Sequence, residues 1–205
     1  MLKNETYIIG VTGHRDIHPH AFKQIKEVIS NWLDQQILSY GGSNLIIQSP
    51  LAAGADQLVA QLAIEKGVKT IAPLPFPVER YKKDFDDSEV KMFSSLLGQV
   101  NSFFTVSAKP TIENRYLTVG AYIAQSSHAL LALWDGHITP ELEGGTAHII
   151  RYQLTDFPEE LVIKQPVGDR KTFWLQTPRS SASNWEFNNE FIQLKPSTYA
   201  DIKGE

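Results

Sequence analysis

Small, polar and acidic residues gather where apolar runs of the sequence end. Thr12-Gly13-His14-Arg15 follows the first such run, Gly54-Ala55-Asp56 follows the second, and Asp135 and then Gly144-Gly145-Thr146 follow the run at residues 129–134. Glycines beside the start of a helix let backbone N–H groups approach an anion closely. Any one of these turns can instead serve only to pack a helix against a strand. Together they predict a shallow pocket walled by backbone amides, suited to phosphate, ribose or a flat base.

Two arginines are placed to hold a phosphate in this pocket. Arg15 lies just beyond the first apolar run, and Arg115 lies where a helix is predicted to begin. A guanidinium group can bind phosphate through two parallel hydrogen bonds. The alternative is an exposed ion pair, of Arg15 with Asp16 or of Arg115 with Glu113, which would contribute little to stability.

The other polar side chains near these turns have predicted roles of their own. Asp56 is placed to cap the helix that follows it, and Asp135 can accept hydrogen bonds from ribose hydroxyls or cap the next helix. His14 is placed to donate a hydrogen bond to a ligand. The three histidines between residues 14 and 20 do not predict a metal site, because a proline interrupts them and no carboxylate stands at a recognised ligand spacing. We expect neither a metal nor a cofactor.

The elements that must position these residues alternate along the chain. Short apolar or β-branched runs fit strands, and the segments between them repeat apolar residues at helical spacing. The predicted strands are 6–11, 44–48, 68–72, 100–106 and 129–134, and the predicted helices are 20–40, 56–66, 78–97 with a break inside it, 113–125 and 147–152. Three prolines between residues 73 and 77 predict a stiff loop. The pattern predicts an α/β, Rossmann-like, doubly wound and mostly parallel sheet with helices on both faces.

The last quarter of the chain differs in character. Residues 171–177 fit a sixth, edge strand, and the sequence from Ser180 onward is polar with scattered aromatic residues. We therefore divide the chain into a Rossmann-like domain at residues 1–155 and a C-terminal extension at residues 156–205. The polar tail suggests a segment of a longer protein with an effector domain elsewhere.

Composition and missing motifs exclude several function classes. With 205 residues, 42% hydrophobic and 20% charged, the chain can form one good core. A formal net charge of -4 gives no general attraction to nucleic acid, and no apolar run approaches the roughly 18 residues of a membrane span. The polar N-terminus is unlike a secretory signal, and the absence of cysteine excludes disulfides, so we expect a cytoplasmic protein. The sequence lacks G-x-x-x-x-G-K-[ST], G-x-G-x-x-G and G-x-S-x-G, so a standard NTPase, dehydrogenase or serine hydrolase is not expected.

Three motifs carry a family resemblance. They are Gly10-Val11-Thr12-Gly13-His14-Arg15, Leu51-Ala52-Ala53-Gly54-Ala55-Asp56 and Gly144-Gly145-Thr146. In this order they resemble the SLOG superfamily, which groups Smf/DprA-like proteins with the LOG or "lysine decarboxylase-like" proteins. The resemblance covers about residues 5–155 and implies a Rossmann-like fold and a nucleotide-derived ligand. In the family, LOG enzymes cleave the N-glycosidic bond of nucleoside monophosphates, whereas other members are proposed to sense nucleotide-derived signals for effector domains, often in phage defence.

The chain departs from the LOG enzymes at catalytic positions. Those enzymes carry P-G-G-x-G-T-x-x-E, whose glutamate is catalytic, whereas Ile149 stands three residues after Thr146 here. Arg115 lies about one helical turn further from the strand than the catalytic arginine of the enzymes. Asp135 or Glu143 could stand in as the acid. The DprA branch binds single-stranded DNA through a basic surface, which the net charge of this chain does not favour.

We therefore predict a domain that binds and senses a nucleotide or a nucleotide-derived small molecule, without catalysis. An N-glycosidase of the LOG kind is the alternative, and a scaffold whose pocket is filled by side chains is a third. We expect no nucleic-acid or membrane partner. A homo-oligomer is expected, formed through the faces of the fourth or fifth predicted helix.

Overall fold

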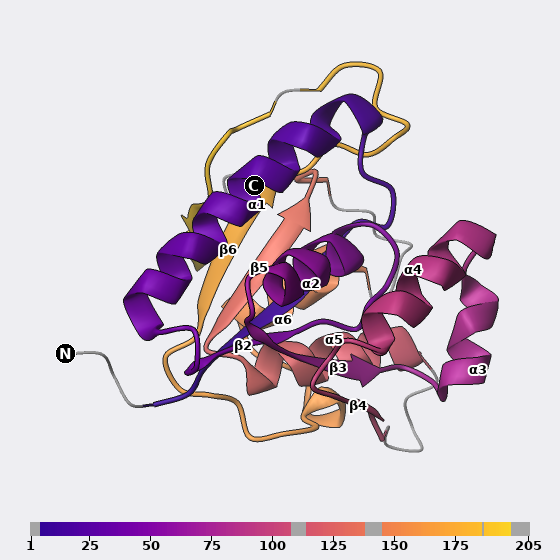
Figure 1. The fold of residues 1–205 in the computed structure, drawn as a ribbon. Helices are drawn as coiled ribbons and strands as arrows, with labels where there is room; N and C mark the ends of the chain where they lie inside the picture. Colours follow the sequence, from indigo (N-terminus) through magenta and orange to yellow (C-terminus); the bar gives the residue numbers. More distant parts are fainter. Residues whose placement is uncertain (1–4, 108–113, 138–144, 186, 198–205) are drawn as a thin grey trace.

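One sheet with helices on both faces organises the protein (Figure 1). The structure is a computed structural model that describes residues 5–107, 114–137, 145–185 and 187–197. Within these ranges the strands lie in the order β4-β3-β2-β1-β5-β6-β7, and all neighbours are parallel except β6 and β7. Their bounds are β1 Tyr7–Gly13, β2 Leu45–Gln48, β3 Lys69–Leu74, β4 Ser102–Thr105, β5 Ala129–Trp134, β6 Lys171–Gln176 and β7 Ile192–Leu194. The predicted α/β, Rossmann-like fold class is confirmed.

The interior strand β5 contributes to the cores on both faces of the sheet. All six of its residues are buried, and successive side chains of a strand point to opposite faces. Leu131 packs with residues of α1 and α2, whereas Leu130 packs with residues of α5 and α6. The helices are α1 Pro19–Tyr40, α2 Ala55–Glu65, α3 Val78–Tyr81, α4 Asp87–Leu97, α5 Arg115–Ser126 and α6 Thr146–Leu154, with 3-10 turns η1 Lys82–Asp84 and η2 Glu159–Leu161. The break predicted inside the helical segment 78–97 is present, because η1 separates α3 from α4.

The strand order reverses between β1 and β5. From β1 the chain steps outward through β2 and β3 to β4, and then returns to place β5 on the other side of β1. The helices that follow β1 and β5 therefore lie on opposite faces of the sheet, and a crevice opens between them at the carboxyl ends of these strands. Parallel α/β proteins bind their ligands at such a point.

Two strand predictions need correction. Pro73 and Leu74 belong to β3 and not to a loop, because both pair with β4. The pairing of β3 with β2 ends earlier, at Ile71. The missing N–H of the proline therefore falls where β3 has a single neighbour, β4. Residues 171–176 form β6, which is not an edge strand, because β7 pairs with its outer side.

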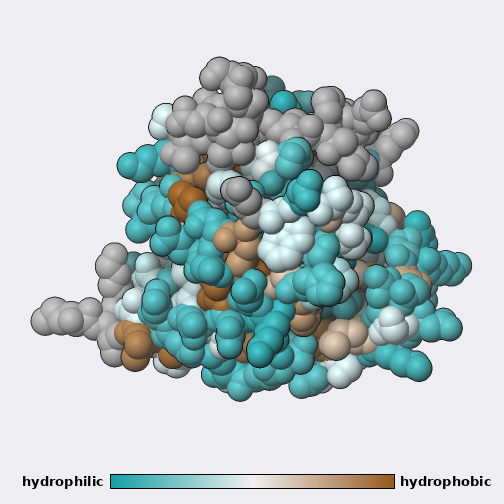
Figure 2. Space-filling model, turned by 90° about the horizontal axis from the view of Figure 1, so that it is seen from above, coloured by the Kyte–Doolittle hydropathy of each residue, from teal (hydrophilic) through white to brown (hydrophobic). Residues whose placement is uncertain are grey.

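Figure 2 looks at the molecule from above the view of Figure 1, on the side where β5 ends. Hydrophobic and weakly polar residues gather near the middle of this face, and hydrophilic residues lie beside and below them in the view.

None of the helices in the described parts of the chain has both the length and the hydropathy needed to cross a membrane.

Candidate functional site

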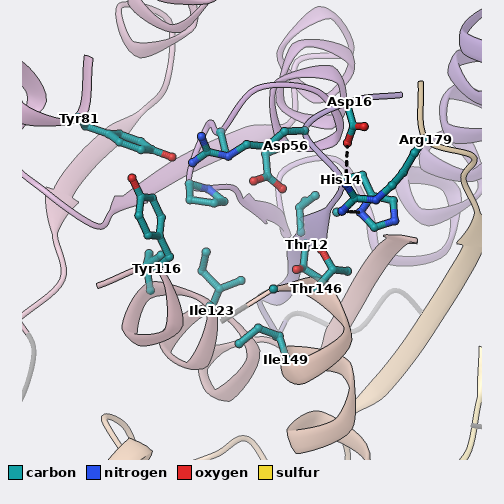
Figure 3. A pocket seen from close by; sticks show the side chains of 18 residues that line it. Thr12, His14, Asp16, Asp56, Tyr81, Tyr116, Ile123, Thr146, Ile149 and Arg179 are labelled. Atoms are coloured by element: carbon teal, nitrogen blue, oxygen red, sulfur yellow. Dashed lines mark hydrogen bonds and ion pairs between the residues drawn. The ribbon is translucent and has the colours of Figure 1, made fainter. Parts of the chain in front are cut away.

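A cavity of about 450 Å³ lies where the strand order reverses (Figure 3). Its wall comes from the turn after β1, the loop after β2, Tyr81 of α3, one face of α5, the first turn of α6, and Arg179 beyond β6. Cavities of roughly 300–1,000 Å³ hold small-molecule ligands in proteins. The volume and the position at the carboxyl edge of the sheet both mark this cavity as the candidate site.

The turn after β1 forms one wall and is tied to its neighbours by backbone hydrogen bonds. The N–H of His14 donates to the carbonyl oxygen of Leu133 at 3.0 Å, and its carbonyl oxygen accepts from the N–H of Ala55, also at 3.0 Å. A Cβ atom on Gly13 would lie 2.4 Å from the Cβ of Ala55, so only glycine allows this approach. The predicted residues Thr12 to Arg15 all line the cavity.

Arg15 is an exposed cation at the cavity. Its guanidinium carbon lies 5.4 Å from the centre of the Tyr116 ring, and Arg15 takes part in no ion pair among the described residues. Asp16, which the sequence offered as an ion-pair partner of Arg15, is paired instead with Arg179, at 3.2 Å. Arg15 is therefore a charged group of the cavity wall without an ion-pair partner among the described residues.

Tyr116 is held in place beside Arg15 by a hydrogen bond to Asp84. Its hydroxyl donates to Asp84, which also pairs with Arg80 at 2.6 Å. Partial burial opposes ionisation of Asp84, but the hydrogen bonds from Tyr116 and Arg80 lower its pKa below the ordinary value. A fixed aromatic ring next to a guanidinium suits a flat, partly charged ligand.

Asp56 lies in the first turn of α2 but does not cap it. Gly54 occupies the N-cap position, and Oδ1 of Asp56 is buried without a hydrogen-bond partner among the described residues. The predicted capping role is therefore wrong, because the side chain points into the cavity (Figure 3). Burial raises the pKa of Asp56 well above its ordinary value, and the charge of Arg15 and a hydrogen bond from the backbone of Ala52 oppose this shift only in part.

His14, Asp16, Asp135 and Arg179 form a polar network at the cavity wall. Nδ1 of His14 lies 3.1 Å from Nη2 of Arg179, and Nε2 lies 3.1 Å from Oδ1 of Asp135 and 3.0 Å from its backbone N. The backbone N–H of Asp135 donates to Nε2, and Nδ1 faces the guanidinium of Arg179, which can only donate. Burial opposes ionisation of Asp135, but the hydrogen bonds from His14 and from the N–H of His137 lower its pKa.

Only some of the remaining predicted site residues line the cavity. Gly145 and Thr146 line the cavity at the start of α6, whereas Gly144 lies outside the described residues. Gly54 and Arg115 do not belong to the lining, although Tyr116, the neighbour of Arg115, does. Asp135 lines a second, adjoining cavity of about 190 Å³ that shares Arg179 with the first. The described residues contain no cluster of three metal-ligating side chains of the His, Cys, Asp or Glu type.

Sequence reasoning missed Tyr81, Tyr116 and Arg179. The signal for Arg179 was present, because it follows a strand just as the chosen residues do, but the strand at 171–177 was assigned to an extension outside the site. Tyr116 stands beside the chosen Arg115. Tyr81 gave no local signal, since it reaches the cavity only through the packing of α3.

Comparisons with known proteins give a likeness of fold. No protein-family model matches the chain, and no curated protein matches it. Among solved structures, it resembles the X-ray structure of DNA processing protein A (DprA) from Streptococcus pneumoniae, with a TM-score of 0.53 and 16% sequence identity. The match covers 82% of this chain and 50% of that chain, so the protein spans about half the length of the structure that it resembles. The similarity is consistent with the predicted SLOG resemblance at the level of the fold.

Proposed function

We propose that the protein is a binding domain for a nucleotide or a nucleotide-derived small molecule, and that it senses this ligand without consuming it. The observation that carries the proposal is the open cavity at the point where the strand order reverses, with an arginine in its wall that has no ion-pair partner in the described chain. An open cavity of about 450 Å³ counts against the scaffold alternative, in which side chains would fill it.

The wall of the cavity offers complementary groups for each part of a nucleotide. Arg15 supplies a positive charge, and the first turn of α6 supplies backbone N–H groups at Gly145 and Thr146. Tyr116 and the apolar side chains of Val119 and Ile123 supply a surface for a flat ring. A cavity that offers both charged or N–H groups for a phosphate and an apolar, aromatic surface for a base favours a nucleotide over a simple sugar or a lipid.

The residues in the catalytic positions of LOG enzymes favour binding over hydrolysis. Ile149, which stands where those enzymes carry a glutamate, presents an apolar side chain to the cavity. Asp135, a possible substitute acid, is occupied by His14 and Arg179 and lines the adjoining cavity. A ligand bound at this site would therefore be released unchanged, and its binding would be communicated to an effector domain or partner.

Thermal-shift screening of the purified chain tests the proposal. The compounds are AMP, ADP, ADP-ribose, cyclic ADP-ribose and cyclic di- and oligonucleotides. A ligand present at about one hundred times its Kd should stabilise the protein by about 2.7 kcal/mol. Arg15→Ala should weaken binding roughly tenfold or more, because charged hydrogen bonds to the phosphate are lost, whereas Arg151→Ala on the exposed end of α6 should not.

The same screen separates sensing from hydrolysis. After overnight incubation, chromatography should return the stabilising compound unchanged. Recovery of free base and ribose phosphate would instead establish the N-glycosidase alternative. If no compound in the screen raises the melting temperature, the nucleotide-binding proposal fails.

We also propose a homo-oligomer formed through the outer faces of α5 or α6, the fourth and fifth helices predicted from the sequence. Light scattering over a concentration series should show a species of twice the chain mass. Adding the stabilising compound should shift the dimer population if the ligand signal is communicated through this contact. A monomer at every concentration, with and without the compound, would contradict the proposal.

A further inference from the structure

Asp56 differs from the other acidic side chains around the cavity. Asp16, Asp84 and Asp135 each form an ion pair with an arginine or a histidine. Asp56 has a side chain only 5% exposed, and it takes part in none of the ion pairs among the described residues. Its Oδ1 is buried without a partner. This polar atom has no partner within the described protein, although its residue lines the cavity.

The surroundings of Asp56 disfavour the ionised form of its carboxyl group. Removing a charge from water is costly unless a partner compensates it, and a buried carboxyl group binds a proton instead. The titratable groups that share this part of the cavity are Arg15 from the turn after β1, Tyr81 from α3 and Tyr116 from α5. Of these, Arg15 favours the ionised form, but it is exposed at the rim and forms no ion pair with Asp56.

The two oxygens of Asp56 have different surroundings. A backbone hydrogen bond from Ala52 reaches the carboxyl group, and Oδ1 is the atom left without a partner. The carboxyl group points toward the cavity (Figure 3), so a neutral Asp56 can donate its proton to a ligand there.

We infer that Asp56 is a neutral carboxylic acid that donates a hydrogen bond to an acceptor of the bound ligand, a nucleobase ring nitrogen or carbonyl oxygen. This inference rests on the proposed function and names the orientation of the ligand within the same site. A phosphate would have to lose its hydration to reach the buried Asp56, whereas it can stay partly hydrated beside the exposed Arg15. The base therefore lies deep, and the phosphate stays at the rim.

Substitutions at Asp56 distinguish a donor from an acceptor. Asp56→Asn keeps a donor of nearly the same shape, whereas Asp56→Ala removes it. For AMP and ADP-ribose as probes, calorimetry should show an affinity within about threefold of the original for Asp56→Asn and a loss of roughly tenfold for Asp56→Ala. Asp87→Asn is the matched control, because Asp87 also lies in the first turn of an 11-residue helix but is exposed. Equal losses for both Asp56 variants, or no loss for either, would overturn the donor role.

The pH dependence of stability provides a readout without ligand. A carboxyl group with a raised pKa in the folded state stabilises the protein at low pH, and this contribution is lost as the pH rises through the folded-state pKa. Asp56→Asn should therefore gain in melting temperature relative to the original chain as the pH rises above about 4, the ordinary pKa of an aspartate. Asp87→Asn should show no such gain.

Carbon-13 NMR of the carboxyl groups decides the protonation state directly, with Asp56→Asn identifying the signal. We expect the Asp56 signal to remain that of the protonated acid at pH 7, and an ionised signal there would reject the donor role. The two proposals fail in different ways. A screen without any ligand rejects the proposed function together with the donor role, whereas an ionised Asp56 in a chain that binds its ligand rejects the donor role alone.

Discussion

A chain that ends at Thr155 should not fold cooperatively, because β6 belongs to the same sheet as the strands before it. β6 pairs with β5 over all six residues of each strand. Leu175 is fully buried in the core cluster that contains α1 and α2, and Nε1 of Trp174 donates to the carbonyl oxygen of Trp134 at 2.8 Å. Removing β6 exposes one side of β5 and several large apolar side chains, each worth about 1.5–3 kcal/mol when buried.

The loss should exceed what the remaining chain can tolerate. Domains of this size are stable by only about 5–15 kcal/mol, and the unpaired backbone groups of β5 add to the cost. Thermal melts followed by circular dichroism, together with amide NMR spectra, should show no cooperative transition and poor dispersion for residues 1–155. A chain ending at Ser197 keeps β6 and β7 and should melt close to the full chain. Cooperative unfolding of residues 1–155 would instead support the domain boundary predicted at residue 155.

Gly54→Ala should destabilise the protein by at least about 3 kcal/mol. Gly54 has a φ of 76° and a ψ of -119°, a region that side chains other than glycine enter at a cost of about 1–3 kcal/mol. In addition, a Cβ atom at this position would lie 2.3 Å from the carbonyl oxygen of Arg15. Backbone atoms cannot move aside as the end of a flexible side chain can, so the turn after β1 would have to shift.

Gly67→Ala is the matched control for this substitution. Gly67 follows the other end of α2 with a similar φ of 71°, but a Cβ atom added there would have no heavy atom within 4 Å beyond its chain neighbours. Its cost should be about 1–2 kcal/mol, the strain of a left-handed residue alone. Denaturant unfolding of both variants measures the difference. Equal losses of stability in the two variants would show that the close approach of Gly54 to Arg15 does not add to the cost of the substitution. If Gly54→Ala does displace the turn after β1, it should also weaken ligand binding.

The sequence by itself determined the fold class and the edge of the sheet that carries the site. Short apolar runs alternate with helical patterns, and parallel strands bring their carboxyl ends to one edge, so Thr12 to Arg15, Asp56 and Gly145 could be placed near one another. These inferences depend on local periodicity and on a general rule of topology. They require no knowledge of which side chain meets which.

The tertiary structure decided which charges are paired and which remain available. Asp16 pairs with Arg179, about 160 residues later in the chain, and this leaves Arg15 without an ion-pair partner in the described structure. Asp56 was predicted to cap α2, but packing buries it at the cavity and leaves Oδ1 without a partner. The sequence could not determine these outcomes, because the energy of a charged or polar group depends on burial and on partners that are distant in the chain. Local patterns specify the elements, whereas the chemistry of the site depends on contacts that exist only after those elements have packed.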